Sequence, residues 1–357
     1  MAKELLKGNV ALAEAALRGG CDFFAGYPIT PSTEALEYLS IRMGEIGLGT
    51  RFVQAENEIS AINMVSGAAA AGARALTASS GPGISLKQEG VSYAARYCLP
   101  YVLVNVQRWG TALGSLDSGQ GDYFRETKGG GHGDYHNIVY APSNIQELVD
   151  DAYEAFEVAE KYRNGVTILS EAVLGQMIEA VEMPPFKKRE QELDFGIDGT
   201  GTKGLKYSSA VGAPFLKIIR PKYEKITEEM QRWESFMTED ADYVIVAFGL
   251  CARVSMDVVK TLRARGEKVG LIRPQIVWPY PVKAFEELYK INPNVKGFIS
   301  VENNDLGQMV EDVALASKKA GYNASVYCYA HGAGIPGVKT VVAQYEAIKN
   351  GEVKERY

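Results

Sequence analysis

Short apolar segments alternate with helical patterns along most of this 357-residue chain. Residues 101–106 and 166–170 are almost wholly apolar, which is typical of strands buried on both faces of a sheet. Between such segments lie amphipathic or alanine-rich stretches, such as residues 4–18 and 58–73, that predict helices. Strands that alternate with helices form a parallel sheet covered on both faces, so we predict an α/β protein with a doubly wound sheet.

The alternation is interrupted once, which predicts two domains. Residues 184–240 contain the charged run KKREQE and the glycine-rich run DGTGTKG, and strand and helix patterns resume after them. We therefore expect a first domain at residues 1–183, a linker at 184–240 and a second α/β domain at 241–357. The linker is expected either to lie over a partner or to be a plain solvated connection.

Composition excludes several classes of protein. A net charge of -6 argues against nucleic acid or an anionic membrane as the main partner. The sequence has no signal-peptide pattern and no run of about 18 apolar residues, so we expect a cytoplasmic protein. Its four cysteines, Cys21, Cys98, Cys251 and Cys328, lack the spacings of zinc or iron–sulfur sites. We expect them to be buried thiols, so any iron–sulfur centre would belong to another chain.

Polar groups follow four of the predicted strands, at residues 26–32, at Glu58, at residues 77–83 and at residues 104–108. The carboxyl ends of parallel strands line the ligand crevice of a doubly wound sheet, so these four segments are expected to converge.

Glu58 is the most informative of these residues. It stands at the start of a helix of small residues that includes Gly67 and leads to Gly72, where a flat ring or another backbone could approach closely. The helix N-terminus favours the ionised carboxyl, whereas burial favours the protonated one. From the residues alone, a structural role in capping the helix remains an alternative for Glu58.

Several motifs, taken in order, resemble one enzyme family over nearly the whole chain. They are residues 27–32 (YPITPS), 56–59 (ENEI), 77–83, 129–134 (GGGHGD), 162–164 (YRN), 174–177 (LGQM), 301–304 (VENN) and 306–309 (LGQM). The chain resembles the alpha subunit of 2-oxoacid:ferredoxin oxidoreductases, most closely the branched-chain type that acts on 3-methyl-2-oxobutanoate. The resemblance implies a pyrimidine-type thiamine-diphosphate-binding domain followed by a domain like the transketolase C-terminal domain.

The resemblance also implies which residues form the site. The family's catalytic glutamate, which hydrogen-bonds N1' of the aminopyrimidine, matches Glu58, with Glu56 as the competing position. Thr30 and Arg108 match residues that contact the substrate; a guanidinium is well shaped for the planar carboxylate of a 2-oxoacid. The positions expected to lie against the cofactor besides Glu58 are Tyr27, Pro28 and Ile29.

The chain lacks the motif that holds the cofactor's diphosphate. Residues 121–123 (GDY) and 133–135 (GDY) both lack the second glycine of a Gly-Asp-Gly turn, so no metal-binding residue is predicted here. The resemblance then implies thiamine diphosphate shared with a partner, and Mg²⁺ and iron–sulfur clusters on partner subunits. It also implies coenzyme A as co-substrate, ferredoxin as electron acceptor, beta and gamma subunits, and in some members a small ferredoxin-like delta subunit.

Several alternatives stay open at this point. The substrate could be 2-oxoglutarate or pyruvate, and the chain could be a non-catalytic assembly subunit or a self-contained binding module for a nucleotide or small acid. His132, in the glycine-rich run, either approaches the cofactor or faces solvent.

Overall fold

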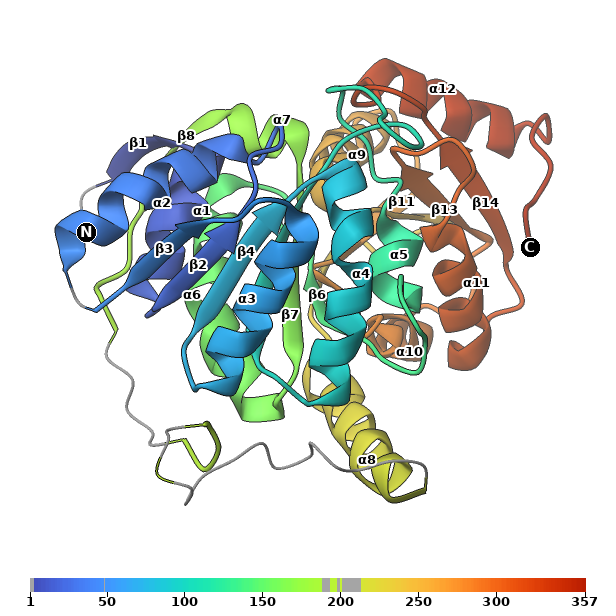
Figure 1. Cartoon of the computed structure of the whole chain (residues 1–357). Helices are drawn as coiled ribbons and strands as arrows, with labels where there is room; N and C mark the ends of the chain where they lie inside the picture. The colour runs from blue at the N-terminus through green and yellow to red at the C-terminus, as the bar shows by residue number, and fades with distance from the viewer. Residues whose placement is uncertain (1–2, 48, 188–192, 198–199, 201–212) are drawn as a thin grey trace.

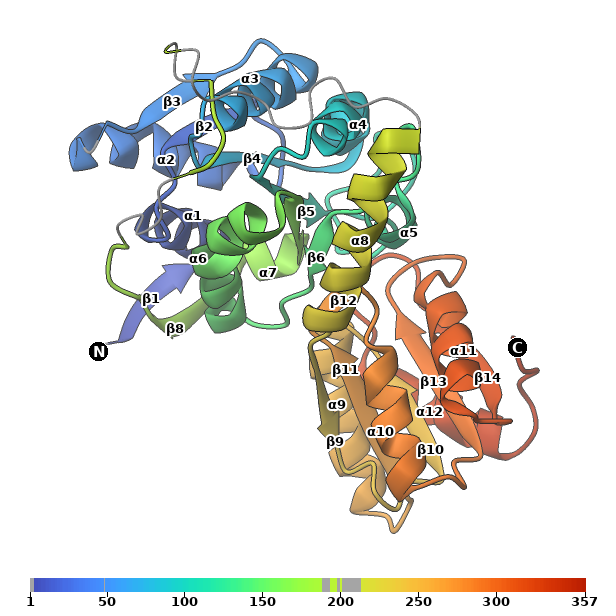
Figure 2. The same cartoon turned by 90° about the horizontal axis from the view of Figure 1, so that it is seen from below.

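The computed structural model describes residues 3–47, 49–187, 193–197, 200 and 213–357. In this part of the chain a seven-stranded sheet and a five-stranded sheet each carry helices on both faces (Figures 1 and 2). A separate antiparallel pair is formed by β1 (Lys3–Lys7) and β8 (Ile178–Glu182). The predicted α/β class with a doubly wound sheet is confirmed.

The seven-stranded sheet has the strand order β12-β6-β7-β5-β4-β2-β3. Its strands are β2 (Phe23–Gly26), β3 (Arg51–Gln54), β4 (Ala75–Ser79), β5 (Tyr101–Gln107), β6 (Ile138–Tyr140), β7 (Gly165–Glu171) and β12 (Ile276–Trp278). All neighbours are parallel except β12 and β6. The central strands β5 and β7 are buried at every residue, which explains their nearly continuous apolar sequence.

Alternate strand residues enter two different cores, because successive side chains point to opposite faces of a sheet. Phe24 and Val104 belong to the core beneath α1 (Gly8–Arg18), α2 (Thr33–Ile46) and α6 (Ile145–Tyr162). Ala25 and Leu103 belong to the core beneath α3 (Glu58–Ala70) and α4 (Gly81–Arg96) on the other face (Figure 2). Two shorter helices complete this region, α5 (Tyr123–Lys128) and α7 (Ala172–Gln176).

The five-stranded sheet has the order β14-β13-β10-β11-β9 and is parallel except for β9. Its strands are β9 (Trp233–Phe236), β10 (Tyr243–Val246), β11 (Val269–Pro274), β13 (Gly297–Glu302) and β14 (Ser325–Ala330). Helices α9 (Gly249–Arg263) and α12 (Val338–Lys349) pack on one face, and α10 (Val282–Ile291) and α11 (Met309–Ala320) on the other. Gly321 ends α11 in the left-handed conformation, which glycine adopts more readily than other residues.

The expected linker contributes regular elements where the structure describes it. It contains α8 (Ala213–Glu229) and β9, and β9 pairs antiparallel with β11 of the second sheet. Residues 188–192, 198–199 and 201–212 of this segment lie outside the described residues. The division into 1–183, 184–240 and 241–357 stays a prediction.

The N-terminal helix begins later than its sequence pattern predicts. Residues 4–7 belong to β1, which pairs with β8, and the helix begins at Gly8. Strand pairing overrides a local helical pattern here, since helix propensity is weak compared with tertiary contacts. None of the helices in the described part of the chain combines the length and apolar character needed to cross a bilayer.

Candidate active site

The carboxyl ends of β2, β3, β4 and β5 meet at one edge of the seven-stranded sheet, because these four strands are parallel neighbours. The four segments singled out in the sequence begin at or close to these strand ends. Three of the predicted site residues, Thr30, Glu58 and Arg108, lie in the segments that follow β2, β3 and β5. The predicted convergence of the loops is confirmed.

Glu58 is the first residue of α3, and only 5% of it is exposed. The cap of this helix is Asn57, whose side-chain oxygen accepts a hydrogen bond from the Ser60 N–H at 2.8 Å. The competing residue Glu56 is exposed in the turn before the helix. The buried carboxyl at this edge is therefore that of Glu58, and the capping role belongs to its neighbour.

The Glu58 carboxyl lies against the first turn of α4. A side chain at Gly83 would overlap Ser79 Oγ and would lie 2.6 Å from Glu58 Oε1. Ser79 and Ser80 are completely buried, and within the described residues their hydroxyls have no hydrogen-bond partner. Because buried polar groups are nearly always paired, unpaired hydroxyls beside a buried carboxyl are a feature expected of a ligand site.

Lys87, on the inner face of α4, is also completely buried. Its Nζ donates to Thr77 Oγ1 at 3.0 Å and to the Glu58 main-chain oxygen at 3.4 Å. Burial lowers the pKa of Lys87 to about 8, and the charge of Glu58 acts in the opposite direction. Sequence reasoning missed this lysine. The available signal was its spacing, three residues after Ile84 and four before Val91, which places it on the buried stripe of the helix.

Arg108 and Thr30 meet at the same edge. Arg108 Nη1 donates to the Thr30 main-chain oxygen at 2.7 Å, and Nη2 donates to the Leu113 main-chain oxygen at 2.6 Å. A side chain at Gly81 would lie 2.8 Å from Arg108 Nε, which is buried and has no partner within the described residues. The first turn of α4 thus lies against Arg108 at Gly81 and against Glu58 at Gly83. The structure therefore brings the predicted residues Arg108 and Glu58 to the same turn.

Tyr27, Pro28 and Ile29 form the first part of the loop that leads from β2 to Thr30. Tyr27 is 39% exposed, and Pro28 and Ile29 are half-buried. Asn9 of α1 anchors the end of this loop by donating to the Pro31 main-chain oxygen at 2.7 Å. The loop follows the strand next to β3, so these residues border the same edge as Glu58.

A second polar cluster, which sequence reasoning also missed, lies beside this edge. Asn105 of β5 donates to Glu126 Oε1 at 2.9 Å and to Asp122 Oδ2 at 3.0 Å. Arg125 forms an ion pair with Asp122 and donates to Ser85 Oγ on α4. Burial raises the pKa of Glu126 to about 7, although Arg125 opposes the rise. An amide within a buried apolar strand, as at Asn105, was the signal that could have revealed the cluster.

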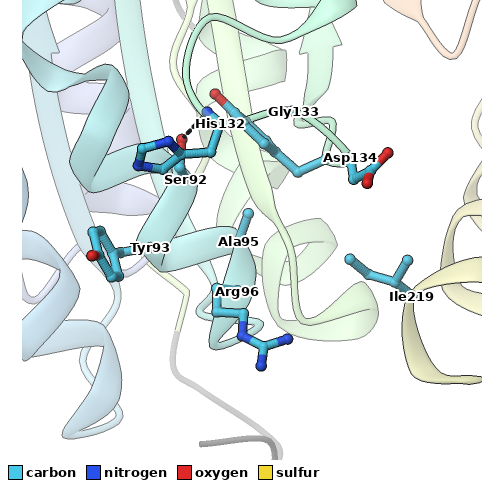
Figure 3. Close-up of a pocket in the computed structure, with 9 residues that line it drawn as sticks. Ser92, Tyr93, Ala95, Arg96, His132, Gly133, Asp134 and Ile219 are labelled. Atoms are coloured by element: carbon cyan, nitrogen blue, oxygen red, sulfur yellow. Dashed lines mark hydrogen bonds between the residues drawn. The ribbon is translucent and has the colours of Figure 1, made fainter. Parts of the chain in front are cut away.

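His132 lies away from Glu58, towards the other end of α4. Its main-chain N–H donates to Ser92 Oγ at 3.0 Å, and its exposed ring stands edge-on to Tyr93 (Figure 3). Between Gly83 and Ser92 the helix rises by about 13 Å. His132 lines a cavity of about 310 Å³ between α4, the glycine-rich loop and α8. The structure does not bring it to the Glu58 carboxyl.

Glu171, at the end of β7, joins the site edge to the second sheet. Its carboxyl accepts hydrogen bonds from the Leu250 N–H of α9 at 2.8 Å, from Gln120 at 3.1 Å and from Ser118 at 3.3 Å. Burial raises the pKa of Glu171 to about 7 despite these donors. Sequence reasoning did not identify this residue.

Glu302 of the VENN motif has a structural role. Its carboxyl accepts hydrogen bonds from the main-chain N–H groups of Gln308, Met309 and Val310, which begin α11. Glu302 therefore caps the start of α11. Within the described residues, no three histidine, cysteine, aspartate or glutamate side chains are grouped so that they could hold a metal ion.

Family models and relatives account for both parts of the chain. Residues 14–213 match the thiamine-diphosphate-binding domain of pyruvate flavodoxin/ferredoxin oxidoreductases, and residues 241–342 match core domain II of pyruvate:ferredoxin oxidoreductase. The chain is 44% identical to the ketoisovalerate oxidoreductase subunit VorB of Methanothermobacter thermautotrophicus, covering 89% of this chain and 90% of the relative. It is 35% identical to the 2-oxoglutarate synthase subunit KorA of Methanocaldococcus jannaschii, covering 90% and 93%.

Solved structures agree with this assignment. The 2-oxoglutarate:ferredoxin oxidoreductase from Magnetococcus marinus, with 2-oxoglutarate, coenzyme A and succinyl-CoA bound, matches with a TM-score of 0.84 and 25% identity. That match covers 97% of this chain but 65% of the longer matched chain. A split-gene transketolase matches with a TM-score of 0.62 and 11% identity, which bears on the fold alone and agrees with the predicted transketolase-like architecture. The chain therefore belongs to the 2-oxoacid:ferredoxin oxidoreductase family, as an alpha subunit with a thiamine-diphosphate-binding domain.

Proposed function

We propose that this chain supplies half of a thiamine-diphosphate site in a multi-subunit 3-methyl-2-oxobutanoate:ferredoxin oxidoreductase. This half activates the cofactor's aminopyrimidine and holds the 2-oxoacid. The observation that carries the proposal is the buried Glu58 carboxyl at the start of α3, which faces Gly83 and the unpaired Ser79 hydroxyl.

The residues around Glu58 supply polar groups that an aminopyrimidine ring could use. The absence of a side chain at Gly83 lets the first turn of α4 pack closely against the carboxyl, and the Ser79 hydroxyl beside it has no hydrogen-bond partner among the described residues. Glu58 holds a proton at N1' of the ring, and its burial keeps water from competing for that proton. Tyr27, Pro28 and Ile29 border the same edge. Thiamine diphosphate, when bound, supplies the carbanion stabilisation that amino-acid side chains lack.

Arg108 and Thr30 are proposed to hold the 2-oxoacid. Hydrogen bonds from Nη1 and Nη2 to two main-chain oxygens fix the guanidinium, while Nε and the remaining N–H groups stay available for a carboxylate. The Thr30 side chain is exposed at this edge and can donate to the keto oxygen. The identity to a ketoisovalerate subunit exceeds that to the 2-oxoglutarate subunits, which favours 3-methyl-2-oxobutanoate over 2-oxoglutarate, with pyruvate as the further alternative.

The remaining functions are proposed to reside on partners. Asp122, in one of the two GDY turns, is already engaged by Asn105 and Arg125, which argues against a metal role for it. We therefore assign Mg²⁺ and the diphosphate to a beta subunit and the iron–sulfur clusters to partner subunits. These partners are the beta and gamma subunits and, in some members of the family, a small ferredoxin-like delta subunit. Coenzyme A is the acyl acceptor and ferredoxin the electron acceptor in this scheme.

The test is to copurify the chain with its partner subunits and to measure viologen reduction with coenzyme A and a panel of three 2-oxoacids. These are 3-methyl-2-oxobutanoate, 2-oxoglutarate and pyruvate, and we expect the first to give the highest kcat/KM. Glu58→Gln should lower kcat by roughly 10²–10⁴-fold, since the variant cannot supply a proton to N1'. Glu56→Gln is the matched control, because it changes an exposed glutamate two residues earlier, and it should leave kcat unchanged.

The outcomes separate the alternatives. Full activity of Glu58→Gln in the assembled complex would contradict the catalytic assignment, and a loss confined to Glu56→Gln would move it to that residue. A complex that reduces viologen equally well without this chain would make it an assembly subunit. A higher kcat/KM for 2-oxoglutarate or pyruvate would overturn the substrate assignment alone.

A further inference from the structure

We infer that Lys87 is the counter-ion of Glu58, a positioning residue whose buried ammonium attracts the Glu58 carboxyl and so fixes it at the edge of the site. The inference rests on the proposed function, which gives Glu58 its role at N1'. Lys87 acts through Glu58 and does not itself touch the substrate edge, since its Nζ lies behind the first turn of α3.

The groups that contact the Lys87 ammonium are neutral, and they do not fully compensate its charge. The side chain is completely buried, and its hydrogen-bond acceptors in the described residues are one hydroxyl, Thr77 Oγ1, and one main-chain oxygen, that of Glu58. A buried ammonium is strongly destabilising unless an opposite charge compensates it, because transferring an ion out of water carries a large penalty. A compensating carboxylate nearby is therefore expected.

Glu58 is the group that can provide this charge. Among the described residues it is the one charged group that acts appreciably on the Lys87 ammonium. On α4 itself, the neighbouring Gln88 is uncharged and Glu89 is exposed. Nζ contacts the main-chain oxygen of Glu58 rather than its carboxyl oxygens, so the two charges interact through space across a buried region where screening by water is weak.

The charge of Lys87 also bears on where the Glu58 carboxyl lies. A buried ammonium attracts the carboxyl and restrains its position, because screening by water is weak in this region. The same charge pair stabilises the chain without cofactor, because each ion offsets the burial of the other. Both effects depend on charge and not on the shape of the lysine side chain.

A double-mutant cycle on the full chain tests the charge pair without any cofactor. Thermal unfolding is compared for the wild type, Glu58→Gln, Lys87→Met and the double variant. We expect each single change to lower Tm, and the double variant to unfold no lower than the less stable single variant, because it leaves no buried charge unpaired. Additive losses of Tm would overturn the inference.

Two further variants separate charge from hydrogen bonding. Thr77→Val removes a hydrogen bond of Lys87 but keeps its charge, so its loss of Tm should be the same with Glu or Gln at position 58. Lys87→Gln keeps a hydrogen-bond donor but removes the charge. If Lys87→Met fails to fold, Lys87→Gln takes its place in the double-mutant cycle. Lys161→Met makes the same change at an exposed lysine and should show no coupling to Glu58.

The assembled complex provides the kinetic readout. Lys87→Met should lower kcat roughly tenfold with an unchanged KM for the 2-oxoacid, because the Glu58 carboxyl loses the charge that fixes its position, and displacing a catalytic group by 1 Å can cost about 10²-fold. The ratio of wild-type to variant kcat should approach one above pH 8, where Lys87 of the wild type also loses its charge. A ratio independent of pH would contradict the inference.

The two proposals fail separately. If the cycle is additive while Glu58→Gln is inactive, Lys87 is merely structural and the proposed function stands. If Glu58→Gln is fully active, the proposed function fails whatever the cycle gives.

Discussion

At the scale of single residues, the candidate site depends on two glycines, whose lack of a side chain allows close packing. Gly81 and Gly83 occupy the first turn of α4, and each lies where a side chain would meet a functional group, Arg108 Nε in one case and Glu58 Oε1 in the other. Gly81 also has a φ of +46°, which disfavours other residues. The close approach of this turn to Arg108 and Glu58 is what allows one short segment to organise both.

Gly83→Ala should therefore damage the site. The added methyl group overlaps Ser79 Oγ and crowds Glu58, so we expect a loss of about 1–3 kcal/mol in stability, as for overpacked cores. The kcat of the complex should also fall, because the methyl group displaces the Glu58 carboxyl. A displacement near 1 Å would lower kcat by about 10²-fold. Gly44→Ala is the matched control, because Gly44 lies in α2 with open space around it. That change should raise stability by about 0.5–1 kcal/mol and leave kcat unchanged. Unchanged kcat in Gly83→Ala would contradict the assigned geometry.

Single residues also differ in how far the sequence alone predicts their role. Glu58, Thr30 and Arg108 could be proposed as site residues because they follow predicted strands and match family motifs. The spacing of Lys87 places it on the buried stripe of α4, but its partners Thr77 and Glu58 lie 10 and 29 residues away in the sequence, so no local pattern shows what the buried ammonium contacts. A lysine on a helix is expected to face solvent unless the fold supplies a counter-charge.

At the scale of elements, the start of α3 sets the position of Glu58. Asn57 adopts an extended conformation and its side chain receives the Ser60 N–H, which fixes the first turn. Asn144 caps α6 in the same way, receiving the Glu147 N–H at 2.9 Å, but its helix does not begin at the site. Substitutions at the two caps can therefore be compared to separate an effect on stability from an effect on activity.

Asn57→Ala and Asn144→Ala should each cost about 1 kcal/mol of stability, the usual value of such a cap. Only Asn57→Ala should also lower kcat, because fraying of the first turn of α3 displaces the Glu58 carboxyl. Unfolding by denaturant and viologen reduction, measured on both variants, give the comparison. Equal kcat values for the two variants would indicate that the cap does not position Glu58, and Asn57→Asp should restore both stability and kcat.

Long, strongly patterned elements were predictable and short ones were not. The central strands β5 and β7 could be predicted because burial on both faces leaves a continuous apolar sequence. The strands β6 and β12 have three residues each and pair antiparallel across the two halves of the chain, which no local pattern reveals. β1 was mistaken for the first turn of a helix, since its partner β8 follows only after residue 177.

At the scale of the whole molecule, the segment after Arg108 is fixed between the two sheets. Gln120 donates to Glu171 Oε1 and to the Phe248 main-chain oxygen, and its side-chain oxygen accepts the Asn303 N–H at 3.0 Å. Earlier in the segment, the Leu113 main-chain oxygen receives Arg108 Nη2. The Arg108 side chain is thus supported by a loop whose far end is held by the second half of the chain, so both halves contribute to the candidate site.

Glu171 makes this junction sensitive to pH. Burial raises its pKa to about 7 from an ordinary value of 4.5, so the folded chain binds a proton more tightly than the unfolded chain. The stabilising contribution is complete below pH 4.5 and is lost as the pH rises to about 7, a change of about 3 kcal/mol. Glu171→Gln keeps an oxygen for the Leu250 N–H but cannot titrate, so this fall should be missing from its stability profile. Denaturant titrations of the full chain across this pH range give the comparison, with Glu4→Gln as the control at an exposed glutamate. Parallel profiles for wild type and Glu171→Gln would show that this carboxyl does not link the junction to pH.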